Sequence, residues 1–182
     1  DFADVVIAGG AEAPLSPLTF GAFAIIKTMS QLSGDPAEAC RPFDLARDGF
    51  VMGEGAASLV IEELEHARNR GAHIYAELLG YSLNNDAFHM TTPLPGGEAC
   101  IRAMRDALSD ANLEPEQIDY VNAHASSTQL NDRTETMALK VVFGEHARHP
   151  HATVRRGIPR QMPGVHRDPV PRQPLHERHR CR

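Results

Sequence analysis

The chain has 182 residues, of which 42% are hydrophobic, enough for one domain with a substantial core. Its net charge of −6 hides an asymmetry: residues 148–182 hold 9 of the 18 basic residues and only 2 of the 24 acidic ones. Residues 1–147 therefore carry −13, which excludes a nucleic-acid binder by charge. No window has the length and apolarity of a membrane span, and the first residues lack the basic region of a signal peptide. The three cysteines show no paired or metal-type spacing, which favours a reducing cytoplasm.

The first residues predict a strand followed by a helix. Residues 4–8 form a short apolar strand, which we expect Gly9-Gly10 to close with a sharp turn. No phosphate-loop pattern follows these glycines. Ser16-Pro17 then predicts a helix start, and the apolar side of that helix is made by Leu18, Phe23, Ile26 and Met29. A chain that begins within a strand leads us to expect a fragment.

Residues 41–57, RPFDLARDGFVMGEGAA, form a turn-rich segment that leads into a strand, SLVIEEL. Its charged residues, Asp44, Arg47, Asp48 and Glu54, could form a catalytic set. We favour the interpretation that they bond loop amides and one another, as buried charges must. Cys40 precedes this segment, and nothing near it in sequence would activate a thiolate.

The remaining elements alternate in type. We expect a helix over 62–70 ended by Gly71, a strand over 73–83, a polar turn over 84–93 and a helix over 97–111. A short strand over 118–121 and a helix over 131–143 follow. Alternating strands and helices predict an α/β layered domain.

The segment DYVNAHASSTQLND, residues 119–132, presents His124 at the end of the short strand, followed by three hydroxyl residues. Such a histidine suits hydrogen-bond donation or proton transfer in a cleft. The alternative is a plain capping loop with Ser127 or Thr128 as the N-cap of the next helix. The two interpretations are compatible.

Three motifs carry a resemblance to a known family. Residues 122–128, NAHASST, resemble the NAHxTST signature of the β-ketoacyl-acyl carrier protein synthases, closest to synthase II. The segment from Arg41 to Ala57 and the loop DAFHMTTP at 86–93 resemble two further family segments, in the right order. Polyketide-type domains usually carry EAHGTGT, so Asn122 favours the fatty acid branch. A thiolase is disfavoured by the NAH motif and the DAFHMT loop.

The resemblance covers residues 1–147 and implies a thiolase-like layered αβαβα fold, here incomplete: the end of its N-terminal half and the start of its C-terminal half. Family members are homodimers. They transfer an acyl chain from acyl carrier protein to a cysteine, then decarboxylate malonyl-acyl carrier protein so that the carbanion attacks the acyl thioester. This chemistry implies no organic cofactor and no metal.

By the same resemblance, His124 matches the first catalytic histidine, which donates a hydrogen bond to the malonyl thioester oxygen. Ser126 and Thr128 match hydroxyl residues that hold the pantetheine arm, with Ser126 replacing a threonine, and Thr91 matches a further arm contact. Phe23 matches a phenylalanine near the acyl pocket.

The nucleophilic cysteine, second histidine and lysine of the family have no match by motif in these residues. We therefore expect an internal fragment that is inactive alone. The alternative is a non-catalytic partner of the chain-length-factor type, or an inactive relic.

The tail, 148–182, is rich in Arg, Pro and His and lacks hydrophobic periodicity, which predicts disorder. A basic tail binding nucleic acid or acidic lipid is one interpretation. A metal-binding tract is another, but its histidines lack repeated ligand spacing. We favour a shift of reading frame, because the match to the family ends abruptly.

Overall fold

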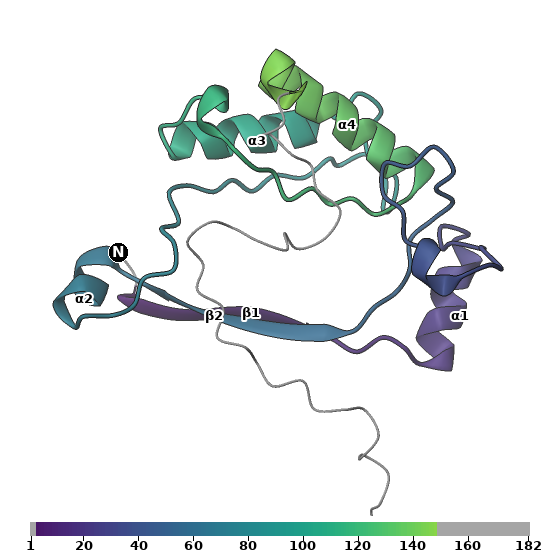
Figure 1. Cartoon of the computed structure of the whole chain (residues 1–182), viewed down its shortest axis with the longest axis horizontal. Coiled ribbons are helices and arrows are strands. Elements are labelled where there is room, and N and C mark those ends of the chain that lie inside the picture. The colour runs from purple at the N-terminus through teal and green to yellow at the C-terminus, as the bar shows by residue number, and fades with distance from the viewer. Residues whose placement is uncertain (1–2, 149–182) are drawn as a thin grey trace, which may run out of the picture.

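The computed structural model describes residues 3–148, so the predicted tail lies outside the described residues except for Arg148. The elements in chain order are β1 (Val5–Glu12), α1 (Pro17–Ile25), η1 (Pro36–Glu38), β2 (Gly55–Glu62), α2 (Leu64–Asn69), α3 (Glu98–Asp110), η2 (Pro115–Gln117), α4 (Gln129–Phe143) and η3 (Gly144–Arg148). Figure 1 shows the β1–β2 sheet along one side of the molecule and the α3–α4 pair along the other. None of the described helices is long and apolar enough to cross a membrane.

The sheet consists of β1 and β2 paired antiparallel, in a register that sets Val5 against Glu62 and Glu12 against Gly55. The prediction that Gly9-Gly10 ends the first strand is wrong, because β1 continues to Glu12. Gly9 is needed for a different reason: a Cβ there would lie 2.5 Å from the carbonyl oxygen of Ala57. The two backbones approach too closely for a side chain at that point.

The apolar side chains of the sheet are largely uncovered by the rest of the described chain. Ile7 is 76% exposed, and Leu59 and Val60 are each 66% exposed. Burial of such side chains is the main source of stability in a folded domain. The sheet therefore contributes hydrogen bonds and shape to this part of the molecule, and little core.

Helix α1 begins as predicted, with Ser16 as N-cap accepting the N–H of Thr19 at 3.2 Å and Pro17 in the first turn. It ends earlier than the apolar pattern indicates, because Lys27 adopts a left-handed φ of 57°. Met29 instead forms a parallel bridge with Phe50. The helix predicted over 62–70 is present as α2, but it begins at Leu64, because Glu62 is the last residue of β2; Gly71 follows it at a φ of 69°.

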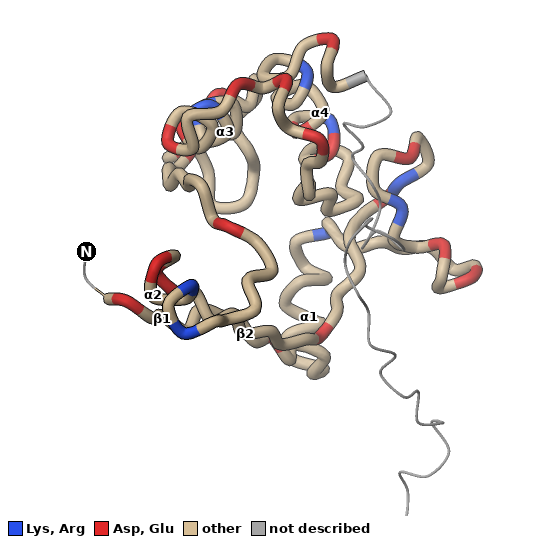
Figure 2. The backbone as a smooth tube through the Cα atoms, turned by 60° about the vertical axis from the view of Figure 1, so that its left-hand side comes forward, with Lys and Arg blue, Asp and Glu red and all other residues tan. Residues whose placement is uncertain are grey.

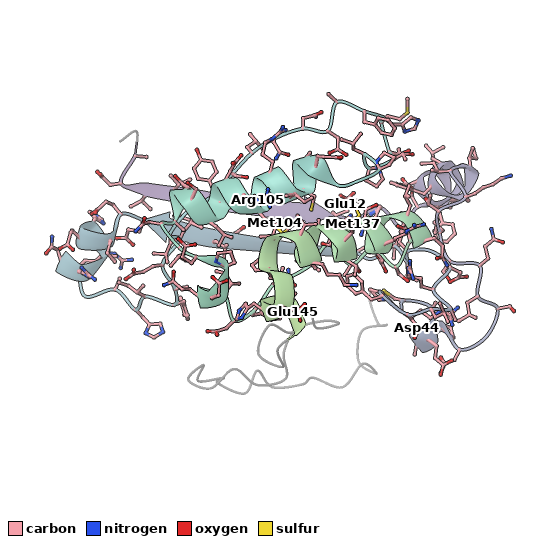
Figure 3. The ribbon with its side chains drawn as sticks, turned by 90° about the horizontal axis from the view of Figure 1, so that it is seen from above. Glu12, Asp44, Met104, Arg105, Met137 and Glu145 are labelled. Carbon is pink, nitrogen blue, oxygen red and sulfur yellow. The ribbon has the colours of Figure 1, made fainter. Side chains whose placement is uncertain are left out.

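The buried core lies on α4. Leu139, Val142 and Phe143 form its centre, and the partly buried residues packed against them are Ile101, Met104, Leu108, Ile118, Val121 and Ala147. Figure 3 shows α3 and α4 side by side, with Met104 and Met137 near the line where they meet. Both helices are confirmed as predicted, with α4 starting two residues earlier, at Gln129.

The strands predicted over 73–83 and 118–121 are wrong for the described residues, which form no sheet there. The first of these segments bonds to α3 instead of to a neighbouring strand. Tyr81 N–H donates to Asp110, the Ser82 hydroxyl to the carbonyl of Ala103, and the Asn84 amide to that of Ala99. Figure 1 shows the chain between α2 and α3 passing below α3, on the side that faces the sheet.

Candidate functional site

The loop from His124 to Thr128 joins the extended segment after η2 to the start of α4. The carboxylate of Glu135 holds the first part of its backbone, accepting the N–H of His124 at 2.7 Å and that of Ala125 at 2.9 Å. Ala125 and Ser127 both have left-handed φ values, 49° and 65°. Such values are uncommon for residues other than glycine and mark a loop whose shape is imposed by its surroundings. His124 is an exposed residue.

The predicted hydroxyl residues lie together beside His124 in the chain. Ser126 Oγ and Thr128 Oγ1 are 2.9 Å apart, and both residues are half-buried. Thr128 Oγ1 also accepts the N–H of Asn131 at 3.3 Å, so Thr128, and not Ser127, is the N-cap of α4. The capping interpretation is thus confirmed, and it leaves the candidate role of this loop open.

Two polar residues at the loop and the first turn of α4 are buried: Ser127 and Asp132, with 0% and 1% of their surface exposed. Asp132 accepts the N–H of Ser127 at 3.1 Å and the N–H of Phe43 at 2.7 Å. Its carboxylate also lies 3.3 Å from Nε of Arg47. Ser127 Oγ accepts the N–H of Arg41 at 3.2 Å. The loop is therefore attached to residues more than 80 positions away.

The charged residues of the segment after Arg41 bond loop amides, as the structural interpretation predicted. Asp44 accepts the N–H of Ala46 at 2.8 Å, and Glu54 accepts that of Leu15 at 3.0 Å. Asp48 accepts the Ser30 hydroxyl at 2.8 Å and the N–H of Gln31 at 2.9 Å. The bonds from Ser30 and Gln31, with the nearby Arg41 charge, lower the pKa of Asp48. None of these contacts arranges a general acid beside a general base.

Two further candidates lie on other segments. Thr91 is exposed, in the loop before α3, where its N–H lies 3.2 Å from Nδ1 of His89. Phe23 on α1 packs edge-to-face on Phe50, with ring centroids 5.8 Å apart and planes at 84°. Within the described residues, no hydrogen bond joins Thr91 to the loop at His124–Thr128. The structure thus gathers His124, Ser126 and Thr128 in one loop and leaves Thr91 and Phe23 outside it.

An open cavity of about 680 Å³ lies against the N-terminal half of α4. Its lining residues are Phe43, Arg47, Pro95, Gly96, Leu130, Asp132, Arg133, Thr134, Thr136, Met137 and Lys140. Glu135, Asp132 and Arg47 were not selected as site residues from the sequence. Asp132 and Glu135 are acidic residues three positions apart in the first two turns of α4. Such positions face backbone N–H groups, so this spacing was a sequence signal for residues that hold the loop before the helix.

Acidic residues are spread along the described chain, with fewer basic ones between them (Figure 2). Among residues 3–148, no group of three or more His, Cys, Asp or Glu residues is placed to hold a metal ion. Cys100 is half-buried; burial chiefly, together with the charges of Glu135 and Asp86, raises the pKa of its thiol. This thiol lacks the electropositive surroundings of a reactive cysteine.

Two sequence families match the chain. The family described as "Beta-ketoacyl synthase, N-terminal domain" matches residues 2–67, and the family described as "Beta-ketoacyl synthase, C-terminal domain" matches residues 75–156. The 3-oxoacyl-[acyl-carrier-protein] synthase 2 of Coxiella burnetii is 49% identical over 145 residues, covering 80% of this chain and 35% of that protein. The enzyme of the same name from Staphylococcus aureus is 50% identical over 147 residues, covering 81% and 36%.

The putative polyketide β-ketoacyl synthase 1 of Streptomyces cyaneus is 54% identical over 145 residues, covering 80% of this chain and 34% of that protein. The chain therefore spans about a third of the length of these relatives.

Solved structures agree with the sequence matches. A ketosynthase of a type II polyketide system, in complex with its acyl carrier protein, superposes with a TM-score of 0.77 at 46% identity, covering 80% of this chain and 36% of that one. A β-ketoacyl synthase from Burkholderia phymatum gives 0.74 at 46% identity, covering 78% and 34%. The predicted fold class, a part of the thiolase-like fold of condensing enzymes, is confirmed by these structures.

Proposed function

Because the chain belongs to the β-ketoacyl synthase family, we propose that it supplies part of the active site of an enzyme that elongates fatty acids. The reaction is a decarboxylative Claisen condensation of an acyl thioester with malonyl-acyl carrier protein. In it, the bond from the malonyl methylene carbon to the departing CO₂ breaks and leaves an enolate. Its carbon then bonds the acyl carbonyl carbon and displaces the thiolate that carried the acyl group. The observation that carries the proposal is the loop that holds His124 beside two hydroxyl residues.

His124 would donate a ring N–H to the malonyl thioester oxygen, where negative charge develops as CO₂ leaves. Ser126 and Thr128 would hold the pantetheine arm through their hydroxyl groups, with Thr91 as a further contact. Phe23, packed on Phe50, would form part of the wall of the acyl pocket. The fixed backbone at His124 supports the first role, because a preorganised donor pays no cost of reorganisation during the reaction.

The partner we propose is acyl carrier protein carrying acyl or malonyl groups, with a homodimer as the assembled form. One of the structural relatives is a ketosynthase in complex with an acyl carrier protein, which supports the first assignment. We place the protein in the cytoplasm, a compartment compatible with the free thiols of Cys40 and Cys100. A non-catalytic partner role is not favoured, since the relatives compared are named as synthases.

The site assignment can be tested on the 182-residue chain by NMR titration with malonyl-pantetheine. We expect chemical-shift changes at the amides of Ser126 and Thr128 and at the His124 ring. Replacing both hydroxyls, S126A with T128A, should weaken binding about tenfold, and H73A, on an exposed histidine, should not. If the saturating shift changes fall only outside residues 124–128, the assignment of the binding site to this loop is wrong.

Condensation itself needs groups that these residues do not match by motif, so we expect the chain alone to give no turnover. A chimera with residues 3–147 replacing the matching segment of the S. aureus synthase would test the activity. We expect that chimera to condense, H124A in it to lose activity, and H73A to retain it.

Type II polyketide synthesis is the second candidate, favoured by the 54% identity to the Streptomyces cyaneus protein. If the products of the chimera carry one added two-carbon unit per acyl chain, the result supports fatty acid elongation. Repeated addition to a poly-β-keto chain supports the polyketide candidate.

A further inference from the structure

Arg47 places a positive charge where the dipole of α4 disfavours one. Its guanidinium lies at the N-terminal end of α4, where the helix dipole is positive and repels cations. Nε donates to the carbonyl of Thr128 at 3.1 Å, and one terminal nitrogen donates to that of Gln129 at 2.9 Å. The other terminal nitrogen donates to the carbonyl of Asp44 at 2.9 Å. Only 12% of this side chain is exposed.

Arg47 donates hydrogen bonds to the backbone at the end of the His124–Thr128 loop. The two carbonyls that it holds belong to Thr128 and to the residue after it, and Asp132 neutralises its charge at 3.3 Å. Gln129 returns the contact through its side-chain amide, which donates to the carbonyl of Arg47. A guanidinium can bond several acceptors at once in a fixed plane, which a lysine ammonium on a flexible stem cannot do.

The same segment reaches the other side of the proposed pocket. Asp48, the next residue, holds Ser30 and Gln31, which follow α1. Phe50 N–H donates to the carbonyl of Thr28 at 3.1 Å, and the Phe50 ring packs on Phe23. Residues 41–50 thus connect the loop at His124–Thr128 with the segment that bears Phe23. Figure 3 shows Asp44 of this segment on the same side of the molecule as the N-terminal end of α4.

We propose that Arg47 is a positioning residue that fixes the His124–Thr128 loop in the conformation that binds the pantetheine arm. It acts through the carbonyls of Thr128 and Gln129 and touches no substrate. The proposal rests on the proposed function for the identity of the ligand. The holding of the loop can be measured without that ligand.

The test compares R47K, R47M and the control R105K in the 182-residue chain; Arg105 is exposed on α3 (Figure 3). Three quantities are measured: the dissociation constant for malonyl-pantetheine, the amide exchange rates and chemical shifts of the ligand-free protein, and the urea midpoint. In R47K we expect the dissociation constant to rise about tenfold and the Ser127 amide to exchange about tenfold faster. We expect shift changes confined to residues 125–132, and R105K should match the wild type in all three.

A lower urea midpoint with unchanged exchange, shifts and affinity in R47K would overturn the proposal, because Arg47 would then only stabilise the fold. R47K retains the positive charge, so it keeps the test valid if R47M does not fold. If the wild-type chain does not bind malonyl-pantetheine, the proposed function fails. The ligand-free exchange and shifts of R47K then still decide whether Arg47 holds the loop.

Discussion

The carboxylate of Asp132 accepts the backbone N–H of Phe43 at 2.7 Å, although the two residues are 89 positions apart. The same carboxylate accepts the N–H of Ser127 and pairs with Arg47, and it is 1% exposed. A buried carboxylate is stable only when donors surround it, and here two backbone amides, the side-chain amide of Asn131 and one guanidinium do so.

Replacing Asp132 by asparagine should lower the free energy of unfolding by about 3 kcal/mol, because Arg47 loses its counter-charge and the new NH₂ group faces the N–H of either Phe43 or Ser127. Urea unfolding monitored by circular dichroism would measure it. The matched control is D106N, on an exposed position of α3, for which we expect a change within about 0.5 kcal/mol. Equal effects of the two substitutions would contradict the structural role of Asp132.

The adjacent glycines of β1 should respond differently to the same substitution. At Gly9, an added Cβ would lie 2.5 Å from the carbonyl of Ala57 and 2.9 Å from the Ser58 hydroxyl, whereas nothing lies within 4 Å of one at Gly10. We expect G9A to destabilise the protein by about 1–3 kcal/mol, and G10A to leave it unchanged or slightly more stable. Thermal melting of both variants would measure the difference. The reverse order would show that the strands are paired in another register.

Glu62 should contribute to stability in a defined pH range. The hydrogen bond from Arg70 has the largest effect on its carboxyl and that from His66 the next largest. Together they lower its pKa to about 2 from an ordinary value of 4.5. Because the folded pKa is the lower one, this contribution is complete above pH 4.5 and is lost as the pH falls from 4.5 towards 2.

Unfolding measured between pH 6 and pH 2 should therefore depend less steeply on pH in E62Q than in the wild type. The control E116Q, on an exposed glutamate, should follow the wild type. An unchanged slope in E62Q would mean that Arg70 does not hold Glu62 in solution.

The two described cysteines should differ in reactivity. Cys40 is exposed, whereas Cys100 is half-buried on α3 and has a pKa raised by burial and by nearby carboxylates. In a C181S background at pH 8, we expect Cys40 to react with Ellman's reagent at least about tenfold faster than Cys100. C40S should leave only the slow phase. A fast phase that survives in C40S would place Cys100 at the surface.

The sequence was sufficient to predict the local features of the fold. The start of α1 follows from Ser16-Pro17, and the N-cap of α4 is Thr128, one of the two residues predicted, because capping depends on side chains within three or four residues. The charged residues between Asp44 and Glu54 bond loop amides as predicted, but Asp48 and Glu54 are exposed, so the cost of burying charge is not the reason.

Features that depend on distant contacts were predicted poorly. The apolar pattern over 73–83 indicated a strand, but a strand also requires a backbone partner, and here the segment bonds to α3. The Gly9-Gly10 pair predicts a turn, whereas the constraint on Gly9 in the structure is the carbonyl of Ala57, 48 positions away. The spacing of Glu135 from Asp132 marks it as an amide acceptor, but only the folded chain shows that the amide it bonds is that of His124.

The contacts between the segment after Arg41 and the start of α4 have a consequence for how this chain folds. They join residues 81 to 89 positions apart, so the entropy of closing a long loop must be overcome before they form. On the ribosome, residues 41–47 emerge well before Ser127 and Asp132 have been synthesised. Until then the amides of Arg41 and Phe43 lack their acceptors in the folded protein, and the candidate site can assemble only in a late step of folding.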